Sequence, residues 1–266
     1  MNPITQSNSG WVILAGAGPG DAELITLKLQ KRLSEADVII TDRLVNPDII
    51  TNHARKDAEV VFAGKQGYNE NSLAQQEVTA LVLEHYGRGK KVLRLKGGDV
   101  AFFSNIFDEL SALVENDIPF EIIPGITAAS GASAYSGIPL TARGYSQGVQ
   151  FLTYNPNSHY SPETWKHLAA SNDTLVFYMS SKNIADLAEL LLRYSRRPQM
   201  QLAVIEQATT IHQEVSITTL QNCAADFAVK TFSSPSLVII GEVVNLHDRF
   251  SWFLPTGQSG TVFQEL

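Results

Sequence analysis

The sequence contains a single cysteine, Cys223, among 266 residues. One cysteine cannot build an internal disulfide framework or a cysteine-rich metal site, and it suits a reducing compartment. No apolar stretch approaches the ~18 residues needed to span a bilayer. Residues 1–10 contain no signal-peptide core. We therefore expect a soluble, cytoplasmic protein with no membrane partner.

Positive charge is also scarce. Lysine and arginine together number 20 against 27 acidic residues, which gives a net charge of −7 with neutral histidines. Such a surface repels nucleic acid and anionic membranes, so we expect neither as a partner, and any anionic ligand would need a local basic cluster. The six histidines show neither H-x-x-x-H nor H-E-x-x-H spacing. This pattern argues against a metal hydrolase, and we expect no metal.

Apolar residues make up 44% of the chain, enough for two domains of ordinary size. Short β-suited runs alternate with segments of helical periodicity in both halves, which predicts an α/β fold. The expected strands are 11–15, 38–41, 59–63, 91–96 and 120–124, then 149–154, 174–178, 202–206, 214–218 and 237–240. The expected division is a loose N-terminus 1–10, an α/β domain 11–140, a second α/β domain 141–252 and a tail 253–266.

The segment Lys91–Asp99 is predicted to form a buried strand followed by a tight loop. Gly97 and Gly98 lack a Cβ atom, so they can adopt positive φ and let a ligand approach the backbone. Asp99 then lies at the carboxyl end of the strand, where open α/β sheets bind ligands. An ordinary helix N-cap at Asp99 remains equally compatible with the spacing.

Two other predicted strands also end in polar loops. Asp42 follows the strand 38–41, and Lys65 follows the strand 59–63. Because parallel strands end at one edge of a sheet, these loops and Asp99 predict a shared site. The alternative is that Asp42 is a helix cap and Lys65 a solvated surface charge.

The glycine loop Gly16–Asp21 follows the first predicted strand and is a weak signal alone. It resembles both a dinucleotide-binding fingerprint and the first motif of S-adenosylmethionine methyltransferases. Asp21 stands where the dinucleotide motif needs glycine. Asp42, about twenty residues further on, keeps a Rossmann oxidoreductase open as an alternative.

Eight motifs in order carry a stronger resemblance. They are Gly16–Asp21, Asp42–Val45, Gly64-Lys65, Arg94–Asp99, Pro124–Ala129, Gly137–Thr141, Tyr178-Met179 and Ser234-Pro235. Together they resemble the tetrapyrrole methyltransferase family over residues 11–252, most closely the members that methylate uroporphyrinogen III. The resemblance implies two α/β domains with an active-site cleft between them, S-adenosyl-L-methionine as cofactor, S-adenosyl-L-homocysteine as its product, and a homodimer. It also implies C-methylation of uroporphyrinogen III to precorrin-2, on the way to siroheme or a cobalamin.

The same resemblance assigns roles to individual positions. It implies that Asp42 is the proton acceptor and Lys65 the proton donor. The implied cofactor-binding residues are Pro19, Gly97, Gly98, Asp99, Phe102, Thr127, Ala128, Met179 and Ala208. A substrate with eight carboxylates calls for basic side chains, and the candidates are Arg43, Arg94, Lys96 and Arg143. Strand alternation puts Arg94 and Lys96 on one face of the sheet but does not say which.

The chain departs from the family pattern mainly where substrate would bind. Val100, Ser104–Ile106, Ala142 and Tyr154-Asn155 replace the family's usual proline, glycine-arginine-glycine, histidine and glycine-histidine, and Gln66 replaces an arginine. The cofactor is therefore better defined than the substrate, and a different tetrapyrrole is the closest alternative. A non-catalytic binding module would keep the fold but lose Asp42 or Lys65, and both are present.

Overall fold

A computed structural model describes residues 10–63, 75–157, 160–256 and 260–263. The chain divides into two compact units, Met1–Thr127 with Thr261–Leu266, and Ala128–Gly260. Each unit has its own five-stranded sheet. The division falls before helix α5 (Ala128–Ser136), which the sequence had placed in the first domain.

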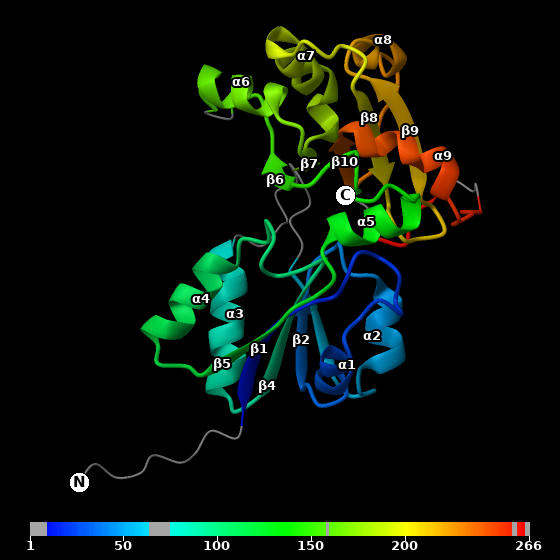
Figure 1. Cartoon of the computed structure of the whole chain (residues 1–266). Coiled ribbons are helices and arrows are strands. Elements are labelled where there is room, and N and C mark those ends of the chain that lie inside the picture. The colour runs from blue at the N-terminus through cyan, green and yellow to red at the C-terminus, as the bar shows by residue number, and fades with distance from the viewer. Residues whose placement is uncertain (1–9, 64–74, 158–159, 257–259, 264–266) are drawn as a thin grey trace. The chain divides into compact units, whose positions relative to one another are not determined.

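The sheet of the first unit is entirely parallel, with strand order β3-β2-β4-β1-β5 (Figure 1). Its strands are β1 (Trp11–Gly16), β2 (Val38–Thr41), β3 (Glu59–Phe62), β4 (Lys91–Lys96) and β5 (Phe120–Ile123). Each predicted strand in this half is confirmed. β1 and β2 are buried and show the continuous apolar run of central parallel strands, whereas the edge strands β3 and β5 are largely exposed.

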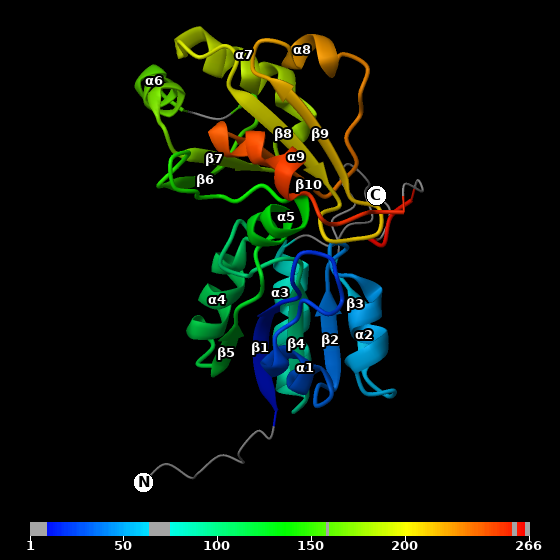
Figure 2. The same cartoon turned by 45° about the vertical axis from the view of Figure 1, so that its right-hand side comes forward.

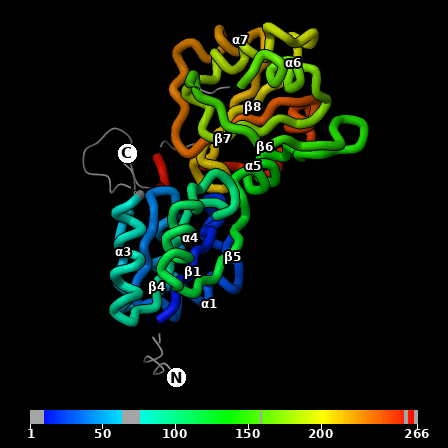
Figure 3. Tube along the Cα trace, turned by 90° about the vertical axis from the view of Figure 1, so that its left-hand side faces the viewer, coloured from blue at the N-terminus to red at the C-terminus, as the bar shows by residue number. Residues whose placement is uncertain are grey.

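Helices cover both faces of this sheet. α1 (Leu27–Leu33) and α2 (Pro47–His53) pack on one face, through Leu29, Leu33 and Ile49. α3 (Gln75–Gly87) and α4 (Ile106–Glu115) cover the other face, which is turned toward the viewer in Figure 3. The unit is therefore a doubly wound α/β layer structure.

Alternation along β4 places its side chains in two different cores. Leu93 and Leu95 join the core beneath α1 and α2, whereas Val92 joins the core beneath α3 and α4. Arg94 lies with Val92 on the α3 and α4 face, and Lys96 follows at the same parity. The structure thus shows which face of the sheet carries Arg94 and Lys96, which the sequence left open.

The second unit has a mixed sheet with strand order β6-β7-β10-β8-β9. Its strands are β6 (Val149–Thr153), β7 (Thr174–Tyr178), β8 (Gln201–Glu206), β9 (Glu214–Thr219) and β10 (Ser236–Ile240). Only β6 and β7 pair in parallel; the other neighbouring pairs are antiparallel. The five strands predicted for this half are confirmed.

Two apolar cores lie on opposite faces of this second sheet. α6 (Pro162–Ala170), α7 (Ile184–Tyr194) and α8 (Cys223–Asp226) pack on one face, and α5 packs on the other (Figure 2). The chain after β10 forms the 3-10 helix η2 (Glu242–Leu246) and α9 (His247–Phe250). Within the described residues, none of the helices combines the length and apolar character that a membrane crossing requires.

Candidate functional site

Three glycine loops pack backbone against backbone at the carboxyl edge of the first sheet. Gly18 and Gly98 exchange two backbone hydrogen bonds, with N···O distances of 3.1 and 2.8 Å. A Cβ atom on Gly16 would lie 2.5 Å from the Gly98 carbonyl oxygen and 2.8 Å from the Gly125 nitrogen. Position 16 requires glycine, because any side chain there would separate the loops that follow β1, β4 and β5.

Asp99 ties these loops together. One carboxylate oxygen accepts a hydrogen bond of 2.6 Å from the Ala101 amide, and the other accepts one of 3.2 Å from the Gly125 amide. Helix α4 begins at Ile106, and its N-cap is Asn105. Asp99 is therefore not the N-cap of this helix, and that reading of the sequence is wrong.

Asp42 lies in the next loop, directly after β2. Its side chain is half-buried and accepts a 3.0 Å hydrogen bond from the Leu44 amide. A Cβ atom on Gly97 would lie 2.6 Å from the Leu44 side chain, so this loop packs directly on the twin glycines. The N-cap of α2 is Asn46. The cap reading of Asp42 is therefore also wrong, while Lys65 lies outside the described residues.

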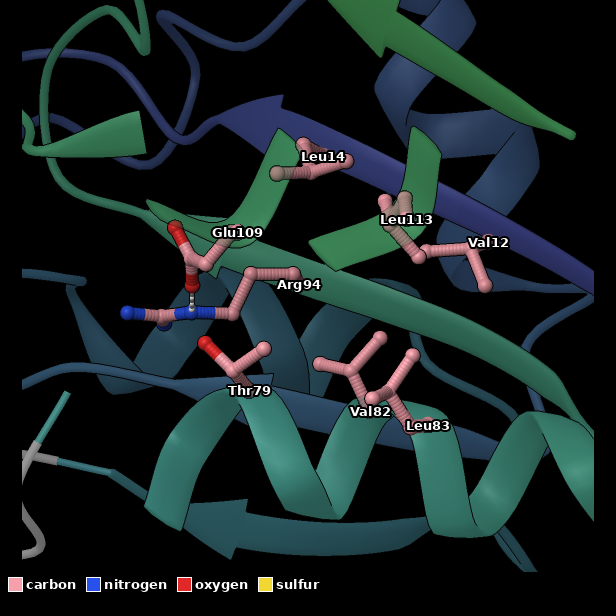
Figure 4. Close-up of a pocket in the computed structure, with 8 residues that line it drawn as sticks. All are labelled: Val12, Leu14, Thr79, Val82, Leu83, Arg94, Glu109 and Leu113. Atoms are coloured by element: carbon pink, nitrogen blue, oxygen red, sulfur yellow. Dashed lines mark hydrogen bonds and ion pairs between the residues drawn. The ribbon is translucent and has the colours of Figure 1, made fainter. Parts of the chain in front are cut away.

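The two basic residues of β4 form a buried ionic cluster with Glu109 of α4. Figure 4 shows the pairing of Arg94 with Glu109. Arg94 Nε lies 2.7 Å from Glu109 Oε1, and Lys96 Nζ lies 2.8 Å from Glu109 Oε2. All three residues are at most 4% exposed. Arg94 also donates to the carbonyl oxygens of Ile40 and Leu95, at 3.3 and 3.0 Å.

Sequence reasoning missed Glu109, although a signal was present. On α4 the apolar residues Ile106, Leu110 and Leu113 recur at helical spacing, and Glu109 falls within that stripe. An acidic residue on the apolar stripe of a helix requires a buried partner. Two basic residues at alternate positions of an otherwise apolar strand supply it.

Other predicted residues of the first unit lie around the same edge. Pro19 is buried, while Phe102 and Thr127 are half-buried. The Phe102 amide donates to the Asp99 carbonyl oxygen at 3.1 Å. Arg43 is half-buried beside Asp42; burial lowers the pKa of its guanidinium, and the negative charge of Asp42 opposes that shift.

The second unit carries its predicted residues on unusual backbone. Met179 follows β7 with φ +54° and is 66% exposed. Ala208 follows β8 and is buried between Gln207 and Thr209, which have φ of +45° and +71°. Positive φ is rare for side-chain-bearing residues and clusters at functional sites.

The sheet of the second unit brings these two loops to one edge. β7 and β8 both pair antiparallel with β10, so they run in the same direction and end on either side of its first residues. The Gln207 amide donates to the Pro235 carbonyl oxygen at 2.8 Å, just before β10 begins. Ala128 is the first residue of α5 and half-buried, and Arg143 lies exposed beyond that helix.

No group of three or more metal-ligating side chains occurs among the residues that the structure describes. Taken separately, the loops of the first unit offer carboxylates, cations and backbone groups, and those of the second unit offer a thioether and backbone groups. Such groups bind polar organic ligands and move protons.

Comparisons with known proteins place this arrangement in a family. Residues 12–224 match the family model described as Tetrapyrrole (Corrin/Porphyrin) Methylases. The chain is 44% identical over 244 residues to the siroheme synthase of Actinobacillus succinogenes, covering 92% of this chain and 50% of that protein. It is 43% identical over 256 residues to the siroheme synthase of Acinetobacter baylyi, covering 94% and 55%. The chain thus spans about half the length of these relatives.

Solved structures agree with this placement. The uroporphyrin-III C-methyl transferase of Thermus thermophilus, complexed with S-adenyl homocysteine, matches with a TM-score of 0.74 and 33% identity over 89% of this chain and 94% of that one. A cobalt precorrin-4 methyltransferase has a TM-score of 0.79 over 91% and 99% of the two chains at 23% identity, which shows the shared fold. The predicted family is therefore confirmed, and this chain belongs to the tetrapyrrole (corrin/porphyrin) methylases.

Proposed function

We propose that this chain is an S-adenosyl-L-methionine-dependent methyltransferase that converts uroporphyrinogen III to precorrin-2. The observation that carries the proposal is the packing of the Asp42 loop against the twin-glycine loop at one sheet edge. Membership of the tetrapyrrole methylases and the 33% identity to a uroporphyrin-III C-methyl transferase support it.

The residues of the first unit fit the cofactor. Gly16 lets the loops after β1, β4 and β5 pack in direct backbone contact, which brings the ends of these three strands together at one edge of the sheet. Asp99 holds these loops in place, because its carboxylate accepts hydrogen bonds from two backbone amides. We expect the cofactor to be bound by Pro19, Gly97, Gly98, Asp99, Phe102 and Thr127 of the first unit and by Ala128, Met179 and Ala208 of the second. When bound, the cofactor supplies an electrophilic methyl group and leaves as S-adenosyl-L-homocysteine.

Asp42 is the expected base. A pyrrole β-carbon is a poor nucleophile until its ring N–H is lost or hydrogen-bonded. A carboxylate in reach of that proton raises the electron density of the ring and stabilises the positive charge that develops. Asp42 suits this role because it is half-buried and held by the Leu44 amide. Lys65 remains the expected proton donor.

The basic residues divide into two classes. Arg143 is exposed and Arg43 half-buried, so both are suited to meet substrate carboxylates directly. Arg94 and Lys96 are buried and paired with Glu109, so any effect they have on substrate passes through their neighbours.

A different tetrapyrrole is the second candidate substrate, and one observation favours it. Phe107, just after the segment Ser104–Ile106 where the family pattern is basic, is 76% exposed. An exposed apolar side chain there suits a tetrapyrrole with fewer carboxylates than uroporphyrinogen III.

We also propose that the chain is a cytoplasmic homodimer, as its relationship to the family implies. Light scattering coupled to size-exclusion chromatography measures the mass directly. A mass twice that of the 29.1 kDa chain supports the dimer, and a single-chain mass contradicts it.

Two experiments test the proposed activity. Calorimetry should show binding of S-adenosyl-L-homocysteine and none of NAD; the reverse would favour an oxidoreductase. Purified protein should then be incubated anaerobically with uroporphyrinogen III and S-adenosyl-L-methionine. Absorbing, fluorescent methylated products are expected after oxidation. Tight cofactor binding without product would move the assignment to another tetrapyrrole.

A further inference from the structure

Of the two residues in the Tyr178-Met179 motif, only Met179 has been assigned a role so far. Tyr178 ends β7, and its side chain lies in the apolar core between the second sheet and α5, where it is 9% exposed. The ring of Phe151 on β6 packs against it edge to face, with centroids 6.3 Å apart. A hydroxyl group in such a core needs a hydrogen-bond partner, because a buried polar group without one is costly.

The Tyr178 hydroxyl binds the first turn of α5. The amide of Ala129 donates a hydrogen bond of 3.2 Å to the hydroxyl oxygen. Ala129 is the second residue of α5, and amides in the first turn of a helix have no carbonyl partner within that helix. Ala129 is also inaccessible to water, so the protein has to supply the acceptor. The phenol oxygen does so, and it thereby joins the end of β7 to the start of α5.

This hydrogen bond lies among the three residues of the second unit that are assigned to the cofactor. Ala128 directly precedes the donor Ala129, and Met179 directly follows the acceptor Tyr178. Ala208 belongs to the same core as Tyr178, and the half-buried Ala128 packs against that core. The three residues are therefore connected through Tyr178 by a peptide bond, a hydrogen bond and core packing.

We propose that Tyr178 is a positioning residue for S-adenosyl-L-methionine. Its hydroxyl fixes the start of α5 against the loop after β7 and so holds Ala128 at a constant spacing from Met179. A ligand that contacts both residues binds more tightly when that spacing is already set, because no ordering is left to be done on binding. The effect on the cofactor rests on the assignment of Ala128 and Met179 in the proposed function, but the hydrogen bond does not.

Tyr178→Phe removes only the hydroxyl oxygen, and Tyr160→Phe is the matched control. The Tyr160 hydroxyl donates to the Thr153 carbonyl oxygen at 3.1 Å, and its ring packs on Trp165 in the core on the opposite face of the same sheet. Each variant loses one hydrogen bond and no carbon atom, so a general loss of stability would affect both alike.

Calorimetry with S-adenosyl-L-homocysteine is the direct test and needs no tetrapyrrole. We expect the dissociation constant of Tyr178→Phe to rise about tenfold, because the unpaired amide frees the start of α5 and binding must then restore the spacing. Tyr160→Phe should leave the dissociation constant in place. An unchanged value in Tyr178→Phe, or equal increases in both variants, would overturn the proposal.

Two further measurements separate the possible failures. In protein labelled with ¹⁵N-alanine, the amide signal of Ala129 should move in Tyr178→Phe and stay in place in Tyr160→Phe; a signal that stays in both would overturn the proposal. With uroporphyrinogen III, the loss should appear in KM for S-adenosyl-L-methionine rather than in kcat. A wild-type protein that binds S-adenosyl-L-homocysteine but forms no methylated product would refute the proposed function, while the affinities of the two variants would still decide the role of Tyr178. If Tyr178→Phe does not fold, hydrogen exchange of the Ala129 amide in the wild-type protein decides: it should slow when S-adenosyl-L-homocysteine binds, and an unchanged rate would overturn the proposal.

Discussion

Both units are built around a five-stranded sheet, but they differ in strand direction and in how polar groups are placed. The first has an all-parallel sheet and buries charge, with Arg94, Lys96 and Glu109 beneath its helices. The second has a mixed sheet with positive φ at Met179 and at the residues flanking Ala208, in the loops after β7 and β8. In the first unit the described side-chain-bearing residues with positive φ, Phe103, Asn105 and Asp117, lie instead just before and just after α4. In the first unit the buried charges lie beneath α4, whereas in the second unit the backbone at positive φ lies in the two loops that carry Met179 and Ala208.

The largest change in stability is expected from a substitution that breaks the charge cluster. Glu109→Ala should lower the free energy of unfolding of the first unit by about 3–5 kcal/mol, because it removes the carboxylate that both buried cations bind. Glu115→Ala, an exposed position on the same helix, should cost less than about 0.5 kcal/mol. Urea unfolding followed through Trp11, with Trp165 and Trp252 replaced by phenylalanine, reports on this unit. Equal effects of the two variants would show that the cluster contributes nothing to stability.

A smaller effect of opposite sign tests the strained backbone of the second unit. Met179→Gly should raise the free energy of unfolding by about 1 kcal/mol, because glycine adopts φ +54° without the Cβ conflict. Its exposed side chain contributes little packing that could be lost. Gly87→Ala, in the last turn of α3 with open space around its Cβ, is the matched change in the first unit. A marked loss of stability in Met179→Gly would contradict the assigned strain.

A third effect concerns the surface charges of the first unit and depends on pH. A hydrogen bond from Lys28 and the charge of Arg32 hold the pKa of Glu121 below its usual value. A lowered pKa stabilises the fold above the unfolded value of 4.5, and that contribution disappears as pH falls through the folded pKa. Glu121→Gln should therefore cost about 0.5 kcal/mol at pH 7, a small value because the pair is screened by solvent, and progressively less as the pH falls below 4.5. A cost that stays the same as the pH falls would mean that packing, not charge, is responsible.

The smallest expected effect concerns the single cysteine of the second unit. Burial raises the pKa of Cys223 to about 11, so its thiolate is scarce at neutral pH. Reaction with a disulfide reagent at pH 8 should be negligible in the native protein and rapid in urea. Fast labelling without denaturant would show that the core around α8 opens readily.

The sequence predicted the sheets better than the side-chain pairing. Strands such as β4 are recognisable because apolar residues between glycines leave few alternatives. The burial of Arg94 and Lys96 was not predictable from β4 alone, because it depends on Glu109, which belongs to a separate helix. The positive φ of Met179 carried no local signal either, since no glycine or asparagine marks it.

The boundary between the units also escaped sequence reasoning. The small-residue segment that forms α5 follows β5 directly and reads as a continuation of the first domain. In the structure, its Ala129 and Ala132 pack into the core of the second unit. Small residues carry little pattern, so packing partners rather than periodicity decide where such a helix belongs.

Methyl transfer by Asp42→Asn tests the central claim most directly, with S-adenosyl-L-homocysteine affinity as its internal control. The account predicts unchanged affinity, since Asp42 is assigned to proton transfer, and turnover of uroporphyrinogen III reduced by about 10²–10⁴-fold. Turnover at the wild-type rate would remove Asp42 from the mechanism and contradict the account.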